Sequence, residues 1–130
     1  MLIFGHRFIP SETLYHIEDT DAIVHTPPGA TLLVVFDEKH LDLIGYLREN
    51  DLPFALDVGT VKELVFGENL GARYLLVEET LAKSAQKIAE TYLFDAKILC
   101  RIGDESRIEA MAFEGVDGVI CPEGIVKVIG

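Results

Sequence analysis

Short runs of consecutive apolar residues recur along this chain at nearly constant intervals. The central runs occupy residues 32–36, 54–57, 74–77, 97–100 and 118–121, and their starts are 22, 20, 23 and 21 residues apart. Strands that are apolar throughout, rather than alternating with polar residues, are typical of a parallel sheet covered on both faces. The pattern therefore predicts parallel strands connected by crossover segments.

The segments between these runs have the spacing of amphipathic helices. Within residues 81–92, apolar side chains recur at intervals of three and four positions, which places them on one helix face. Thr60 and Glu63 have the spacing of a capping box, which predicts a helix start. Gly71 and Gly115 each stand just before a strand, where a helix end is expected.

Strands that alternate with helices predict an α/β fold. With residues 1–5 as the first strand, we expect a Rossmann-like, doubly wound, mainly parallel sheet of about six strands. The strand at residues 32–36 is expected near its centre. Residues 11–17 have a helical pattern, and residues 22–26 are predicted as an extra short strand. We expect one domain over residues 1–130, because no linker or low-complexity tract interrupts the pattern.

The charge of the chain argues against several classes of partner. Against 22 acidic residues there are 11 basic ones, so the net charge is −11. Such a surface repels nucleic acid and anionic lipid. The mean hydropathy of +0.28 is high, but no apolar stretch approaches the length of about 20 residues that a membrane helix needs. We therefore expect no nucleic-acid binding and no membrane insertion, and cytoplasmic localisation is the default expectation.

The turn after the first apolar run carries a broken dinucleotide fingerprint. In such a fingerprint three glycines permit a tight turn and close backbone approach to pyrophosphate. Here Gly5 holds the first position, but Arg7 and Pro10 occupy the second and third. We predict that NAD(H) binds weakly or not at all, and that a mononucleotide is the better ligand. Gly5, His6 and Arg7 remain candidate cofactor-binding residues in this turn.

Several motifs together resemble the N-terminal domain of Trk-type potassium-uptake regulators, the RCK (regulator of potassium conductance) family. They lie at residues 1–5, 32–37, 54–60, 71–77, 96–101 and 115–122. The resemblance implies a nucleotide pocket in which Asp37 binds a ribose and Asp57 lies nearby. It implies an adenine nucleotide as cofactor and a homodimer as assembly, with a membrane transporter or another protein as partner. Phe66, Tyr92, Phe94 and Phe113 are candidate contact residues for the dimer.

Polar residues at the ends of the apolar runs are the other candidate ligand-binding residues, because ligands bind at the carboxyl ends of strands in open α/β sheets. Asp37, Asp57 and Glu78 could form a ribose or metal site. Alternatively, acids at these positions only interact favourably with the dipoles of the helices that follow and bind no ligand. Arg101 is expected to pair with a neighbouring acid, or else to meet a phosphate. The four histidines lack the spacing of a metal site, so we predict no metal and treat them as solvent or turn residues.

No motif of a known catalytic class is present, and we predict that the protein is not an enzyme. Cys100 and Cys121 each lie in an apolar run and are expected to be small buried side chains. The sequence thus favours a non-catalytic regulatory or binding module. The alternative is a degenerate α/β scaffold, receiver-like or otherwise, that acts only through protein contacts.

Overall fold

A computed structural model describes all 130 residues and contains one sheet of eight parallel strands in the order β1-β7-β6-β5-β4-β3-β2-β8. The strands are β1 (Leu2–Phe4), β2 (Leu14–His16), β3 (Leu32–Val35), β4 (Phe54–Asp57), β5 (Tyr74–Val77), β6 (Lys97–Arg101), β7 (Gly118–Ile120) and β8 (Ile125–Lys127). Their α-helices are α1 (Leu41–Glu49), α2 (Val61–Leu70), α3 (Glu79–Thr91) and α4 (Ile108–Glu114). The prediction of a parallel α/β sheet is confirmed.

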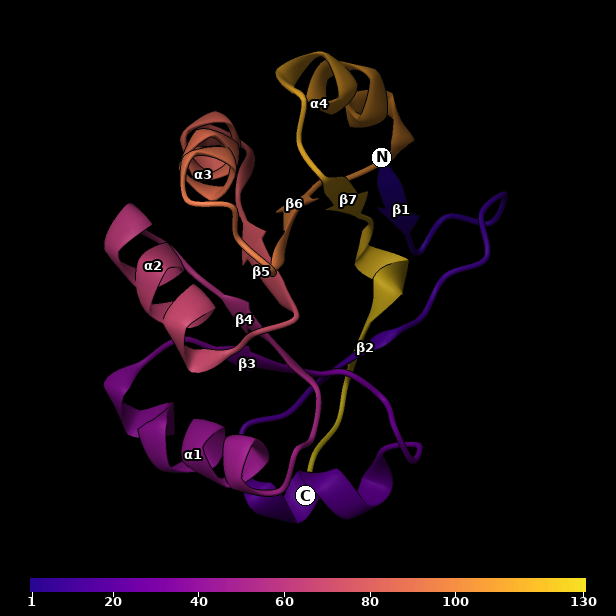
Figure 1. The fold of residues 1–130 in the computed structure, drawn as a ribbon. Helices are drawn as coiled ribbons and strands as arrows, with labels where there is room; N and C mark the ends of the chain where they lie inside the picture. Colours follow the sequence, from indigo (N-terminus) through magenta and orange to yellow (C-terminus); the bar gives the residue numbers. More distant parts are fainter.

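The sheet curves into a half-barrel whose outer face carries the four α-helices (Figure 1). From β2 to β7, strands that are consecutive in the chain are also neighbours in the sheet. Crossovers between parallel strands are right-handed as a rule, so those from β3 to β7 step in the same direction and leave α1 to α4 on the same face. A doubly wound Rossmann-like order would reverse direction once and cover both faces with helices. The doubly wound, Rossmann-like part of the expectation is therefore not confirmed. Strand β3 lies third from one edge, next to the central pair of β4 and β5.

The two strands that the sequence did not predict are β2 and β8. Residues 11–17 were expected to be helical, but Leu14–His16 pairs with β3 on one side and with β8 on the other. Residues 22–26 were expected to be a strand, but they lie largely in the 3-10 helix η1 (Thr20–His25), which is capped by the Asp19 carboxylate. Long-range pairing overrides local propensity in such short segments.

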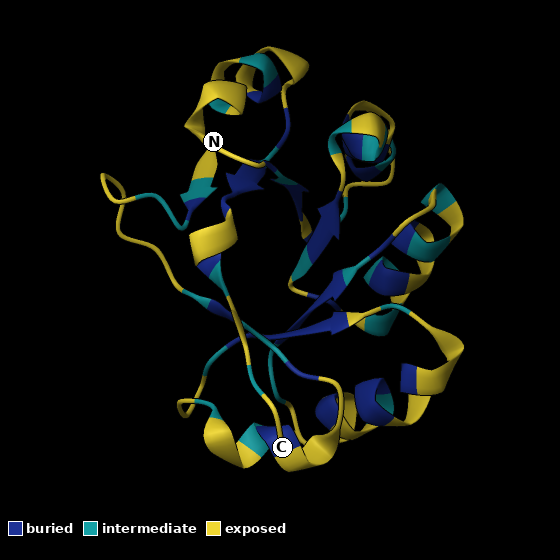
Figure 2. Cartoon of the chain, turned by 180° about the vertical axis from the view of Figure 1, so that it is seen from behind, coloured by how far each residue is buried: buried dark blue, intermediate teal, exposed yellow.

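The central strands of the sheet are buried on both faces, which explains their unbroken apolar runs (Figure 2). The larger core lies between the sheet and the helices. A second core fills the concave face with one side chain from each of the first seven strands: Phe4, Leu14, Leu33, Ala55, Leu76, Leu99 and Ile120. Thus the half-barrel is a packed structure rather than a hollow shell.

The predicted helix boundaries are confirmed. The Thr60 hydroxyl accepts a hydrogen bond from the amide of Glu63 at 3.1 Å, and the Glu63 carboxylate accepts one from the amide of Gly59 at 2.8 Å. Gly71 and Gly115 end α2 and α4 with φ of +91° and +77°. None of the helices combines the length and apolar character needed to cross a membrane.

Candidate functional site

A polar layer lies on the concave face just beyond the inner core. Side chains alternate between the two faces of a strand, so the residue two positions after each inner-core residue again points inward. These next residues are His16 on β2, Val35 on β3, Asp57 on β4, Glu78 after β5 and Arg101 on β6. The apolar filling of the half-barrel therefore gives way to charged groups at the carboxyl ends of the strands, where open α/β sheets bind ligands.

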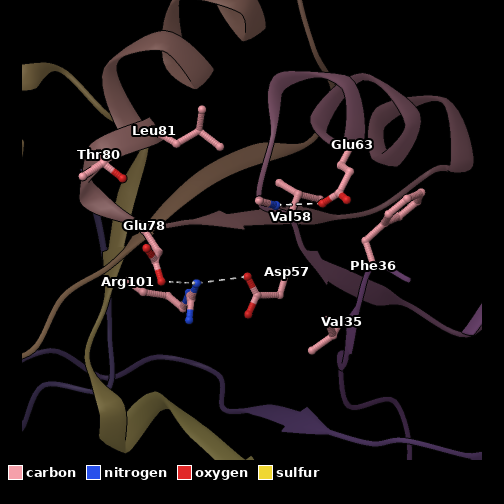
Figure 3. Close-up of a pocket in the computed structure, with 10 residues that line it drawn as sticks. Val35, Phe36, Asp57, Val58, Glu63, Glu78, Thr80, Leu81 and Arg101 are labelled. Carbon is pink, nitrogen blue, oxygen red and sulfur yellow. Dashed lines mark hydrogen bonds and ion pairs between the residues drawn. The ribbon is translucent and has the colours of Figure 1, made fainter. Parts of the chain in front are cut away.

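Three of these side chains converge in space, as Figure 3 shows. Arg101 Nη2 lies 3.2 Å from Asp57 Oδ1 and 3.5 Å from Glu78 Oε1. The Asp57 side chain is 20% exposed, whereas that of Glu78 is 71% exposed. The expected ion pair of Arg101 with neighbouring acids is confirmed. Among the site residues predicted at the strand ends, Asp57, Glu78 and Arg101 lie together, whereas Asp37 does not join them.

These three residues line an open cleft of about 360 Å³, which we call the rim cleft. Its other walls come from the ends of β3 and β4 and from the starts of α2 and α3: Val35, Phe36, Val58, Gly59, Glu63, Thr80 and Leu81. The volume lies within the range of small-molecule sites, about 300–1,000 Å³. The cleft thus offers both charged groups and apolar walls to a small ligand.

The electrostatics of the rim cleft are set by burial and by the arginine. Desolvation raises the pKa of Asp57, and the Arg101 guanidinium opposes that rise. Arg101 Nε is buried and has no hydrogen-bond partner, so it is a donor that a ligand could satisfy. The two carboxylates supply acceptors for hydroxyl groups. No three His, Cys, Asp or Glu side chains are grouped closely enough to hold a metal ion.

His16 belongs to the same inward layer, and sequence analysis missed it. Burial lowers its pKa, and its Nε2 atom is buried without a partner. His40 was also treated as a solvent or turn residue, but it is buried, and its Nδ1 atom lies 2.8 Å from the carbonyl oxygen of Val35. The signal for His16 was its position two residues after Leu14, which is informative only once β2 is recognised as a strand.

The turn at Gly5, His6 and Arg7 is not part of the rim cleft. It lines a separate cavity of about 470 Å³ with residues from the β6–α4 and β7–β8 connections. Within this turn the Gly5 amide donates to the Ser11 hydroxyl at 3.2 Å, and His6 Nε2 lies 2.5 Å from Glu105 Oε2. The guanidinium of Arg7 lies over the ring of Phe8. The turn is thus held by contacts within the protein.

The connection after β1 also differs from the expected strand–turn–helix unit. It leads to β2 instead of a helix, so no helix N-terminus follows Gly5 to receive a pyrophosphate. The strand–turn–helix interpretation of this turn is therefore wrong, independently of the glycine pattern.

Asp37 is also set apart from Asp57. Its carboxylate accepts a hydrogen bond from the amide of Lys39 at 3.0 Å and so caps the 3-10 helix η2 (Glu38–His40). Asp37 lines a groove between α1 and α2 instead of the rim cleft. The structure therefore does not bring Asp37 and Asp57 into one ribose site, and for Asp37 it favours the helix-capping interpretation.

No family model matches the chain, and no curated protein matches its sequence. The assignment of a function therefore depends on the geometry of the fold and of the rim cleft.

Proposed function

We propose that this protein is a non-catalytic binding or regulatory module that holds a small polar ligand in the rim cleft. One observation carries the proposal. Asp57, Glu78 and Arg101 converge from three neighbouring strands on a cleft of about 360 Å³, and Arg101 Nε is left without a partner. A buried donor without a partner is unfavourable, and a ligand that accepts its hydrogen bond removes that penalty.

The charges in the cleft indicate the class of ligand. Three carboxylates, of Asp57, Glu63 and Glu78, and one guanidinium give the cleft a net charge of −2, and the chain as a whole carries −11, so a polyanion is disfavoured. Carboxylates accept hydrogen bonds from vicinal hydroxyl groups, as in a ribose. We therefore propose a nucleoside or an adenine mononucleotide, bound through Asp57 and Glu78, with NAD(H) as a poor ligand.

The surroundings of the cleft favour binding over catalysis. Both cysteines are buried, and they contribute to the core between the sheet and the helices rather than to the rim cleft. No serine, cysteine or lysine lines the cleft.

The wider biological role remains a prediction. Regulation of potassium transport, with a membrane transporter as partner, follows from the resemblance to RCK domains. The strand order differs from that of a doubly wound fold. The proposal of a ligand-binding module rests on the rim cleft and not on the resemblance to RCK domains.

The homodimer is proposed on the aromatic side chains that the helices expose: Phe66 is 47%, Tyr92 is 69% and Phe113 is 85% exposed. Phe94 is half-buried and contributes less. Light scattering that detects only monomer at high micromolar concentration would contradict the homodimer.

The alternative function is a scaffold that acts only through protein contacts. The same exposed aromatic side chains, on α2, on α4 and at the end of α3, are those that such a scaffold would use. The two functions differ in whether the rim cleft binds a small molecule at all.

Calorimetry with adenosine, AMP, ADP, ATP, NAD⁺ and NADH tests the proposal. We expect AMP or adenosine to bind more tightly than NADH, and Asp57→Asn and Arg101→Met to weaken binding about tenfold or more. Arg107→Met is the matched control, because Arg107 pairs with Glu79 at 2.8 Å but does not line the cleft. If no nucleoside or nucleotide binds, or if the control weakens binding as much as Arg101→Met, the proposal is wrong.

A further inference from the structure

We infer that the groove between α1 and α2 is a second binding site, and that it takes a small amphiphilic anion with an apolar body and one carboxylate or sulfonate end. We call it the outer groove. It lies among the helices, away from the concave face, and its volume of about 690 Å³ exceeds that of the rim cleft. Its lining residues are Phe36, Asp37, Glu38, Leu41, Arg48, Lys62, Glu63, Phe66, Asn69 and Leu70.

The outer groove exists because α1 and α2 are set apart. Along the helix layer, α2 packs more closely on α3 than on α1. The ring of Phe36 lies in the gap and stacks on that of Phe66, with centroids 6.1 Å apart and planes inclined at 28°. Phe66 is 47% and Leu41 is 49% exposed, so the groove has an apolar surface that solvent reaches. Such a surface favours the apolar body of a ligand.

Gly45 lies on the face of α1 that carries two residues of the outer groove, and the space beside it is open. Leu41, Gly45 and Arg48 lie on one face of α1, because positions four and seven apart share a helix face. A Cβ at Gly45 would meet no atom within 4 Å, and its φ is not in the left-handed region. Neither packing nor backbone geometry therefore requires glycine at this position. Glycine also lowers the stability of a helix when it lies in the helix interior. A side chain there would narrow the groove.

The charges of the outer groove give the ligand its expected polarity. Of the three acids in the groove, Asp37 and Glu63 have their carboxylates engaged by backbone amides at the starts of their helices, whereas Glu38 forms no ion pair within 4.0 Å. Arg48 and Lys62 form no ion pair within 4.0 Å, so they are the cations that remain free for a ligand. The acids stand at the starts of the two helices beside Lys62, whereas Arg48 lies in the last turn of α1. The anionic end of the ligand therefore lies at Arg48, away from the acids.

A simpler interpretation is that Arg48 only complements the dipole of α1 at its carboxyl end. That interpretation predicts an effect of Arg48 on helix stability and none on the binding of anions. The two interpretations are separated by a binding measurement that compares ligands of opposite charge.

The experiment uses calorimetry with dodecanoate and dodecyltrimethylammonium, both kept below their micellar concentrations. We expect dodecanoate to bind at least tenfold more tightly than the cation of equal chain length. Arg48→Met should weaken dodecanoate binding about tenfold, and Lys62→Met should weaken it by a smaller factor. Lys87→Met is the matched control, because Lys87 is exposed on α3 and does not line the groove. The control variant should bind like the wild type.

The Gly45→Leu variant tests the location of the site, because it fills the groove without meeting another atom at its Cβ. It should melt at or above the wild-type Tm and lose dodecanoate binding. If Gly45→Leu does not fold, Phe66→Ala tests the opposite wall, on α2, by removing the stacked ring. The inference is wrong if dodecanoate does not bind, if the cation binds equally well, or if Arg48→Met behaves like Lys87→Met. Unchanged binding by a folded variant of the groove wall also overturns it. None of these outcomes bears on the rim cleft, whose test uses nucleotides.

Discussion

Arg101 Nη2 lies 3.2 Å from Asp57 Oδ1, although β5 runs between the strands that carry the two residues. The arginine therefore reaches across its neighbour on the concave face to a carboxylate that is 20% exposed. Because desolvation raises the pKa of Asp57 and Arg101 only partly offsets it, the charged carboxylate is held at some free-energy penalty. A carboxylate whose pKa is perturbed by burial and by a specific charge partner, and which lies in a cleft, is typical of a ligand site.

Removal of the arginine should make that penalty visible. We predict that Arg101→Met lowers the free energy of unfolding by about 1–3 kcal/mol at pH 7, because it leaves Asp57 without its cation. The folded-state pKa of Asp57 is raised, so its stabilising contribution is complete below the ordinary value of 3.8 and is lost as pH rises through the folded value. Arg101→Met raises that folded value further, so its deficit should shrink at acidic pH.

Urea unfolding of wild type, Arg101→Met and the double variant with Asp57→Asn checks this prediction. The double variant should recover most of the lost stability at pH 7, because the unpaired carboxylate is gone. A deficit of Arg101→Met that is the same at pH 4 and pH 7 would show that the two residues are not coupled.

Gly5 and Gly124 bring the end of β1 against the start of β8. Gly5 has φ of +79°, and a Cβ there would lie 2.3 Å from the backbone nitrogen of Gly124. We predict that Gly5→Ala destabilises the fold by about 3 kcal/mol or more, because backbone strain and overlap add. Gly71→Ala is the control: its φ is +91°, but a Cβ would meet nothing within 4 Å. It should lose only about 1–2 kcal/mol. Equal losses in urea unfolding would exclude a tight approach at Gly5.

Tyr74 should ionise only at strongly alkaline pH. Burial, together with the hydrogen bond from its hydroxyl to Glu12 Oε2 at 2.5 Å, raises the pKa of Tyr74 to about 12. Its contribution to stability is complete below the ordinary value of 10.0 and is lost as pH rises through about 12. Absorbance titration near 295 nm should show one late step, and Tyr74→Phe should remove it. A late step that persists in the variant would assign it elsewhere.

Both thiols should be unreactive in the folded protein. Burial raises the pKa of Cys100 to about 11 and also raises that of Cys121, and the two residues are 0% and 4% exposed. The thiolate is the reactive form, so a disulfide reagent at pH 8 should modify neither residue until the chain is unfolded in denaturant. Rapid modification of either thiol under native conditions would show that the outer core opens easily at that strand.

Much of the candidate site could be predicted from sequence, because period and position carry that information. Asp57, Glu78 and Arg101 each follow an apolar run, and parallel strands bring their carboxyl ends to one edge. His16 was out of reach, because three residues of β2 have no local pattern that distinguishes a strand from a helix. The prediction that Asp37 shares a ribose pocket with Asp57 depends on the strand order. The residues around Asp37 do not specify that order.

The sequence by itself determined the parallel α/β class, the six strands from β1 and β3 to β7, and the helix caps at Thr60 and Gly71. The helix caps depend on local hydrogen bonds. The strands depend on the burial of apolar runs, which is favourable whatever the order of the strands in the sheet. Only the tertiary structure decided the direction in which successive strands are added, the curvature of the sheet and the pairing of β2 with β8. Those choices arise from contacts between residues far apart in the chain, such as Gly5 with Gly124, whose close approach has no signature in either local segment.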